Sequence, residues 1–293
     1  MSVPGHRLDI YSNTHDPDIL LNNFQSALKL RRFDQAYSLA SLMKDEKYFL
    51  ELANAALYNL DMCTASRVFE KLGEGSGVLT LEGIKEVEDI KLLSGHIAEF
   101  FVKNYDLAES LYLSSSNPCA ALEMRKSLFQ WDPALKLAET LSPKEVPFIS
   151  KEYAEQLEFT GDYVSALHHY EKALLDDSLN DTETLHQNIC RAGIARTAIR
   201  CSDYRRGIAL AEKINMPAVY QDCASILEEM KVISDAAFLY EKGGFLENAA
   251  ALYIKLKNWK KVKDFLPYIT SPKVFTQYAK AQEAEGKYSE AAA

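Results

Sequence analysis

Histidine, cysteine and carboxylate side chains, the groups that most often ligate metals or act as catalysts, form no recognisable site in this sequence. His168 and His169 are the only adjacent histidines. Neighbouring residues on a helix diverge by about 100°, so the two rings cannot easily hold one metal. The sequence also lacks Gly-x-Ser-x-Gly, His-Glu-x-x-His and aspartate-rich diphosphate motifs. We therefore expect no catalytic residue, no metal and no cofactor, and we predict that the chain is not an enzyme.

Two connecting stretches resemble ligand-binding loops at first sight. Residues 73–77 read GEGSG, but no Gly-Lys-Ser/Thr follows them, so we expect a flexible linker and not a phosphate loop. Residues 176–181 read DDSLND, and they lack the glycine and the terminal glutamate of an EF-hand. We expect this acidic run to be a solvated loop between helices.

Five lysines form the densest positive cluster in an otherwise acidic chain. We call them the lysine cluster: Lys255, Lys257, Lys260, Lys261 and Lys263. A solvated outer helix face would explain it without any function. The alternative is contact with an acidic partner or an anionic lipid surface, because charge opposite in sign to the net charge is typical of docking surfaces. The lysine cluster is therefore a candidate docking surface.

Composition excludes several classes of protein. The formal net charge of −9 makes general nucleic-acid binding unexpected, since phosphate neutralisation needs an excess of Lys and Arg. The five cysteines include no Cys-x-x-Cys pair, and we expect them to be small buried residues in a reducing compartment. The N-terminal residues have no apolar core typical of a signal peptide, and no run approaches the ~18 apolar residues of a membrane span. We expect a soluble intracellular chain with no transmembrane segment.

The elements that organise the chain are short helices whose small and large residues recur together. Residues 234–266 repeat every thirteen positions, with an alanine or valine followed four residues later by a large side chain. Residues four apart share a helix face, so each pair is predicted to lie at a seam between antiparallel helices. The first two pairs are Ala236 with Tyr240 and Ala249 with Tyr253.

A second stretch, residues 150–174, has the spacing of a tetratricopeptide (TPR) helical hairpin. Its expected packing residues include Ala154, Gly161, Ala166 and Tyr170. Similar residues recur 70 and 125 positions later, but other copies of the turn are irregularly spaced. The pattern predicts stacked hairpins of unequal length rather than a regular 34-residue array.

Helix starts are marked by capping side chains placed before prolines, and no sustained period-two pattern indicates strands. The capping residues are Asp16, Asn117, Asp132, Ser142 and Ser271, and Glu145 would complete a capping box with Ser142. We predict an all-α fold, a right-handed α-solenoid of irregular TPR-like hairpins. Residues 1–15 would be an N-terminal extension and residues 16–293 a single solenoid.

Four stretches carry a resemblance to a known family: VPFISKEYAEQLEFTGDYVSALHHYEKA, AALEMRKSL, YDLAESLYL and SPKVFTQYAKAQEAEGKYSEA. They look like the TPR region of the WD-repeat subunits of intraflagellar transport complex A. The resemblance runs from about Asp16 to the end of the chain. Residues 234–262 are less specific, because coatomer and sister transport subunits carry similar runs.

The resemblance implies a non-catalytic scaffold that binds other complex A subunits, and membrane-protein cargo or its adaptors. In that family the solenoid follows N-terminal β-propellers, which are absent here, and the complex serves retrograde transport, cilium assembly and the ciliary entry of membrane proteins. The implied location is the cilium, at the axoneme and basal body, on the cytoplasmic side. A coatomer-type coat solenoid and a peptide-binding TPR adaptor are the alternatives.

The end of the sequence repeats only part of a hairpin. Residues 286–291 copy residues 161–166, but the sequence stops at Ala293 where the earlier copy continues. We expect a fragment of a longer protein whose helix 273–285 exposes an apolar face bearing Val274, Tyr278 and Ala281.

Overall fold

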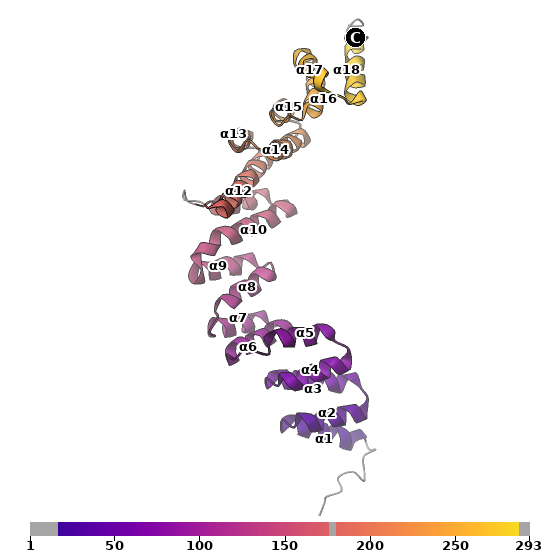
Figure 1. Ribbon diagram of the computed structural model, residues 1–293, viewed down its shortest axis with the longest axis vertical. Helices are drawn as coiled ribbons and strands as arrows, with labels where there is room; N and C mark the ends of the chain where they lie inside the picture. Colours follow the sequence, from indigo (N-terminus) through magenta and orange to yellow (C-terminus); the bar gives the residue numbers. More distant parts are fainter. Residues whose placement is uncertain (1–16, 176–179, 287–293) are drawn as a thin grey trace, which may run out of the picture. The chain divides into compact units, whose positions relative to one another are not determined.

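The computed structural model describes residues 17–175 and 180–286, and within these ranges every regular element is helical (Figure 1). The expected all-α fold of helical hairpins is therefore confirmed. The chain divides into two compact units, residues 1–128 and 129–293, which we call unit 1 and unit 2 and describe separately. A single continuous solenoid with a right-handed sense stays a prediction.

Unit 1 is a series of helices, most of which pack against the next helix in the chain. Its α-helices are α1 Pro17–Lys29, α2 Phe33–Met43, α3 Glu46–Tyr58, α4 Met62–Leu72, α5 Gly75–Ile84, α6 Ile90–Ile97, α7 Tyr105–Leu113 and α8 Cys119–Ser127. A π-helical turn, η1 Ala98–Val102, continues directly from α6. One core cluster centres on Phe24 and Leu52, and a second on Leu57 and Leu81.

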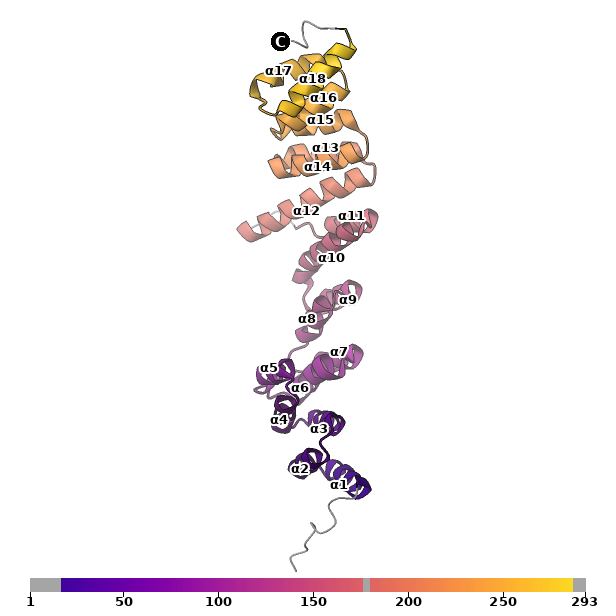
Figure 2. The ribbon, with the colours of Figure 1, turned by 90° about the vertical axis from the view of Figure 1, so that its right-hand side faces the viewer.

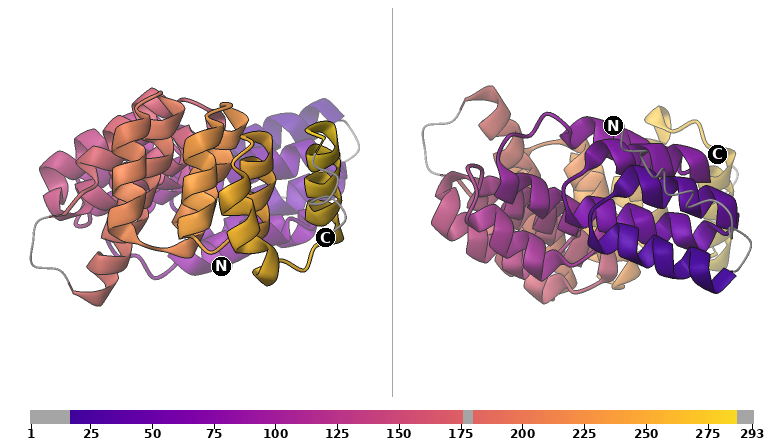
Figure 3. Two further views of the ribbon diagram at one scale, coloured as in Figure 1. Left: turned by 90° about the horizontal axis from the view of Figure 1, so that it is seen from above. Right: turned by 90° about the horizontal axis from the view of Figure 1, so that it is seen from below.

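Unit 2 is also built of helices in series (Figures 2 and 3). Its helices are α9 Trp131–Leu141, α10 Val146–Thr160, α11 Tyr163–Lys172, α12 Asp181–Arg200, α13 Tyr204–Ile214, α14 Pro217–Glu229, α15 Ile233–Lys242, α16 Leu246–Lys255, α17 Trp259–Phe265 and α18 Pro272–Ala284. Two 3₁₀ turns are η2 Pro143–Glu145 and η3 Leu266–Tyr268. In Figure 3 the orange helices of this unit lie side by side, and one buried cluster runs from α12 to α18.

Many of the hairpins turn through the same short link. A residue with positive φ ends the first helix, and an Asp or Asn then caps the second by accepting a hydrogen bond from a backbone N–H. In unit 2, Gly161 has φ +90° and the Asp162 carboxylate accepts from the Ser165 N–H at 3.2 Å. In unit 1, Leu60 and Asp61 form the same link, with 3.1 Å from the Thr64 N–H. So short a link forces neighbouring helices to run antiparallel.

Two of the local expectations that are wrong concern a predicted linker and a predicted capping box. Residues 75–77 of the expected flexible linker are the first turn of α5, a helix held by the buried side chains of Leu81 and Ile84. The expected capping box at Ser142 does not form, because residues 143–145 adopt a 3₁₀ turn and Ser142 Oγ donates to the Glu145 carboxylate instead.

A full capping box occurs where a loop was expected. Asn180 caps α12, and its side chain and that of Glu183 bond each other's backbone N–H groups. Within the acidic run, residues 176–179 lie outside the described residues. The Asp16 cap and the turn copy over residues 287–291 also lie outside them.

The helix near the end of the chain also differs from expectation. Val274 and Tyr278 were expected to be exposed, but both are buried in the core of unit 2. The Tyr278 ring lies edge-on to Trp259 with centroids 6.0 Å apart, and Ala281 packs against the same cluster. The apolar face of α18 is covered because it turns toward α16 and α17.

Enlarging a seam alanine should destabilise the chain. Ala166 is fully buried between α11 and its neighbours, so Ala166→Leu should overpack the seam and cost about 1–3 kcal/mol. The measurement is the thermal midpoint, which should fall by about 2–4 °C per kcal/mol. Ala209→Leu, at an exposed position of α13, is the matched control. Equal midpoints for Ala166→Leu and the parent would contradict this packing.

Candidate functional site

Most of the seam residues predicted from the sequence are buried between helices. Seven of the eight are buried at helix contacts: Ala154, Ala166, Tyr170, Ala236, Tyr240, Ala249 and Tyr253. Gly161 is different, because it lies in the exposed turn with φ +90° and has nothing within 4 Å of the place a Cβ would occupy. Its role is to permit the left-handed turn and not to pack in the seam.

Buried tyrosines at these seams are held by carboxylates from the preceding helix, an arrangement we call a clasp. In the first clasp, the Tyr170 hydroxyl on α11 donates to the Glu158 carboxylate on α10 at 2.7 Å. Arg196 on α12 donates to both oxygens of Glu158, at 2.7 and 2.9 Å. The clasp therefore joins three successive helices through a two-pronged ion pair and one neutral donor.

A glycine makes room for the ring in this clasp. A Cβ built on Gly193 of α12 would lie 2.4 Å from the Tyr170 ring. No larger residue fits here unless the ring moves. The hydrogen bond and the close helix approach thus depend on each other.

The same clasp recurs in two other hairpins. The Tyr253 hydroxyl donates to Glu241 at 2.7 Å, and Lys261 of α17 donates to the same carboxylate at 2.5 Å. In unit 1 the Tyr112 hydroxyl donates to Glu99 at 2.5 Å. The clasped residues are 12 apart in unit 2 and 13 apart in unit 1. The extra residue falls in the π-helical turn η1.

Burial controls the ionisation of the clasps. It raises the pKa of Tyr112, Tyr170 and Tyr253 well above the ordinary value, and each accepting carboxylate raises it further, so these phenols stay neutral donors. Burial alone would raise the pKa of Glu241. Hydrogen bonds from Lys261 and Tyr253 outweigh that effect, so its pKa lies below the ordinary value.

The sequence pattern predicted Tyr170 and Tyr253 as seam residues, but it indicated neither Tyr112 nor the hydrogen bonds that these tyrosines donate. A usable signal was present, because a glutamate stands 12 residues before each of Tyr170, Tyr240 and Tyr253. For Tyr240 the preceding carboxylate is Glu228, whose charge helps to raise the pKa of that tyrosine. A search for Glu and Tyr at this spacing would have indicated both clasps of unit 2.

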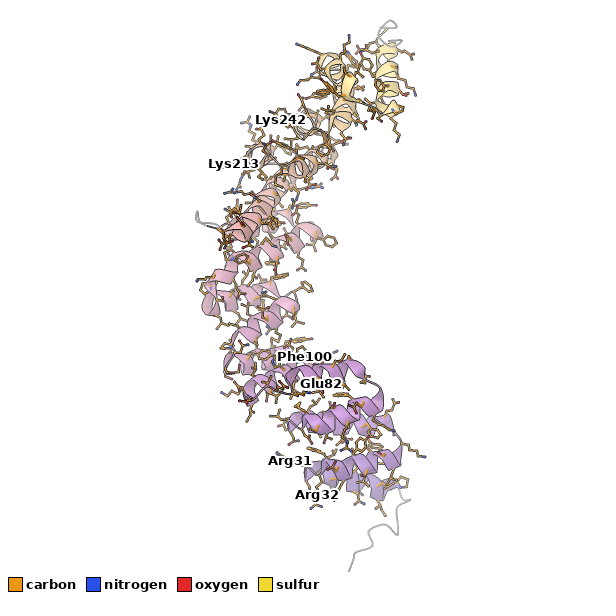
Figure 4. All side chains as sticks on the ribbon, in the orientation of Figure 1. Arg31, Arg32, Glu82, Phe100, Lys213 and Lys242 are labelled. Carbon is orange, nitrogen blue, oxygen red and sulfur yellow. The ribbon has the colours of Figure 1, made fainter. Side chains whose placement is uncertain are left out.

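The lysine cluster is largely balanced by carboxylates of neighbouring helices. Lys255 pairs with Glu228 at 3.3 Å, Lys257 with Glu285 at 3.3 Å, and Lys261 with Glu241 at 2.5 Å. Figure 4 labels Lys213 and Lys242, two lysines of unit 2 outside this cluster. Because at least three of the five charges are paired, the cluster is a weaker positive surface than its sequence suggests.

The remaining chemical groups form no site in the part of the chain that the structure describes. No group of three or more His, Cys, Asp or Glu residues there could hold a metal ion. His168 and His169 are adjacent rings, and burial is the main cause that lowers the pKa of His169. Among the described residues, no helix combines the length and apolarity that crossing a membrane would require.

The cysteines depart from expectation. Cys190 and Cys223 are buried, and burial raises the pKa of each thiol to about 12, so neither is a reactive thiolate. Cys63 and Cys119 are exposed, and the prediction that all five are buried is wrong. Both exposed cysteines lie in the first turn of a helix.

Comparisons with known proteins identify relatives along nearly the whole chain. It is 47% identical over 292 residues to WD repeat-containing protein 19 of Homo sapiens, a match that covers 97% of this chain and 21% of that protein. It is 42% identical over 287 residues to WD repeat-containing protein dyf-2 of Caenorhabditis elegans, covering 98% of this chain and 21% of the relative. The chain thus spans about a fifth of the length of these curated relatives.

A more distant match is to the intraflagellar transport protein 122 homolog of Danio rerio. It is 25% identical over 239 residues, covering 79% of this chain and 19% of that protein. No protein-family model matches the chain. The expected resemblance to WD-repeat subunits of intraflagellar transport, and among them to the protein numbered nineteen, is confirmed by these relatives.

Removing one hydroxyl should weaken the first clasp. Tyr170→Phe deletes the donor to Glu158 while keeping the ring, and should cost about 1 kcal/mol of unfolding free energy. Glu158→Gln should cost more, about 1.5–3 kcal/mol, because it removes the charge that pairs with Arg196. Urea unfolding measures both. Tyr163→Phe, whose ring faces Arg200 outside any clasp, is the control. Equal effects of Tyr170→Phe and Tyr163→Phe would show that the clasp adds no stability.

The clasp of Glu241 should make stability depend on pH. The pKa of Glu241 is lower in the folded chain than in the unfolded chain. The ionised carboxylate therefore adds to the free energy of unfolding above the unfolded pKa, and this stabilisation is lost as pH falls through the folded pKa. Lys261→Met should therefore lower the free energy of unfolding at neutral pH. The difference in unfolding free energy between this variant and the parent should shrink as pH falls below 4.5, the ordinary pKa of a glutamate. Urea unfolding across this range measures the difference, with Lys260→Met as control. A difference that does not change with pH would contradict this assignment.

Proposed function

We propose that this chain, which is homologous along nearly its whole length to a segment of WD repeat-containing protein 19, is a non-catalytic scaffold of intraflagellar transport complex A. The observation that carries the proposal is identity of 42% and 47% over 97–98% of the chain. The weaker match to an intraflagellar transport protein 122 homolog favours this role over that of a vesicle-coat solenoid. On this proposal the partners are other complex A subunits, and the site of action is the cilium.

The architecture supports a role in binding. Hairpins of this kind bury their small residues in seams and leave the opposite helix faces available for partners. The described residues contain no recognisable arrangement of catalytic side chains. Retrograde transport, cilium assembly and ciliary entry of membrane proteins would then follow from assembly with partners. The same helix faces would bind membrane-protein cargo or its adaptors.

The lysine cluster remains a proposed docking surface, but with fewer lysines available to a partner than the sequence suggests. Because Lys255, Lys257 and Lys261 pair with carboxylates, the charge that a partner would meet is carried mainly by Lys260, for which the described residues provide no ion pair. Lys260 is exposed on α17. A carboxylate of a partner could pair with it without displacing an internal partner.

The proposal is tested by co-purification. The tagged chain, co-expressed with the intraflagellar transport protein 122 homolog and the other complex A subunits, should co-elute with at least one of them in size-exclusion chromatography. Lys260→Glu should weaken that association in a salt-dependent way, because screening acts on exposed charges. Lys136→Glu on α9 is the matched control.

Two outcomes separate the parts of this proposal. Absence of every complex A subunit from the eluted chain would overturn the scaffold role. Association that is unchanged by Lys260→Glu at low salt would leave the scaffold role standing and remove the lysine cluster as a docking surface.

A further inference from the structure

An apolar groove of about 630 Å³ lies wholly within unit 1. Leu57 and Tyr58 line it from α3, Phe101 and Val102 from the π-helical turn η1, and Leu107 and Leu111 from α7. A groove of this volume can take several side chains of a partner. Its lining is exposed to a degree unusual for large apolar residues, with Tyr58 87%, Val102 62% and Leu107 46% accessible.

The π-helical turn builds this groove. The turn inserts one residue between Glu99 and the end of its helix, and this is why the clasp of Tyr112 spans 13 residues where those of unit 2 span 12. Phe101 and Val102 come from the widened turn. Phe100, also in the turn, is 45% exposed and is labelled in Figure 4. π-Helical turns are rare and occur frequently at functional sites.

The charges around the groove are unequal. Lys91 lies one turn before the lining residue Ser94 on α6, and Lys103 directly follows Val102; both are exposed, and the described residues provide neither with an ion pair. The acidic neighbours on this side already have partners. Glu99 accepts from Tyr112, and burial raises its pKa. Glu88 and Asp89 precede Lys91 at the start of α6, and the Asp89 carboxylate accepts hydrogen bonds from the backbone N–H groups of Lys91 and Ser116. The positive charge that faces the groove is therefore clearest at Lys103, beside η1.

The carboxylates of α7 are also engaged. Asp106 and Glu109 both accept hydrogen bonds from the Arg125 guanidinium on α8, at 2.8 and 2.6 Å. On the opposite side of the groove, Glu51 is exposed one turn before the lining residue Asn54 on α3. The charge pattern is thus positive toward η1, mixed at the start of α6 and negative toward α3.

We propose that this groove docks an amphipathic helix of a partner protein, with apolar side chains seated among Tyr58, Val102 and Leu107 and with carboxylates facing Lys91 and Lys103. A helix fits better than an extended strand, because the described part of unit 1 has no sheet edge with unpaired backbone groups that a strand could join. The inference rests on the proposed scaffold function and deepens it by naming a surface and the chemistry of its partner.

The test uses two synthetic 18-residue helical peptides labelled with a fluorophore. Both carry the same stripe of leucine and phenylalanine, and one has glutamates beside the stripe where the other has lysines. Fluorescence anisotropy with the whole chain should show the acidic peptide binding at least about tenfold more tightly, a difference of about 1.4 kcal/mol. The preference should shrink with added salt.

Variants locate the binding. Val102→Glu and Leu107→Glu should each weaken binding of the acidic peptide at least about tenfold, whereas Leu79→Glu, 75% exposed in unit 1 but outside the groove, should leave it unchanged. Lys103→Glu should weaken binding of the acidic peptide and improve that of the basic one. Tyr58→Ala serves as a further groove variant, because so exposed a side chain contributes little to folding. Circular dichroism and the thermal midpoint confirm that each variant is folded.

Hydrogen exchange of the parent chain with the acidic peptide should show slower exchange within residues 54–60 and 94–111. Failure of the acidic peptide to bind, equal binding of both peptides, equal loss in Leu79→Glu and Val102→Glu, or slowed exchange confined to other segments would overturn the proposal. Co-purification with complex A subunits does not use these peptides, so loss of the groove proposal leaves the scaffold role to its own test.

Discussion

Close approach of antiparallel helices through small residues is the constraint on which the rest of this structure depends. Alanines such as Ala166, Ala236 and Ala249 are fully buried where one helix crosses the next, and tyrosines fill the space beside them. A methyl group at these positions sets the distance between helix axes, because interiors are packed too densely to absorb extra atoms. The short links with a positive-φ residue and an Asp or Asn cap then direct each helix back along its neighbour.

A tyrosine at such a seam has a buried hydroxyl group that needs a hydrogen-bond partner, and the clasps provide one. A buried hydroxyl without a partner is costly, and a buried carboxylate is more so unless it is paired. Glu158 and Glu241 resolve both needs together, because each accepts from a tyrosine and from a cation of a following helix. The same internal pairing consumes much of the lysine cluster. The faces that we propose for partners are the groove of unit 1 and the exposed side chain of Lys260.

Much of this could be predicted from the sequence where the determining contacts are local. The Ala236–Tyr240 and Ala249–Tyr253 pairs share helix faces by spacing alone, and the turn at Gly161 is a local backbone property. Prediction failed where a distant residue decided the outcome. Tyr278 is buried by Trp259, the glycine-rich start of α5 is held by the buried Leu81, and the lysine cluster is balanced by Glu228 and Glu285. The groove depends on a π-helical turn that has no clear sequence signal.

The most direct test of this account is native-state hydrogen exchange on the unbound chain. If seams of small residues hold each unit together, the slowest amides should lie in the helices that carry the fully buried alanines and the clasped tyrosines, in unit 1 as well as in unit 2. The helix ends and the exposed turns should exchange faster. Slow exchange confined to one unit, or exchange in the alanine-bearing helices as fast as in the turns, would contradict the claim that the seams determine the fold.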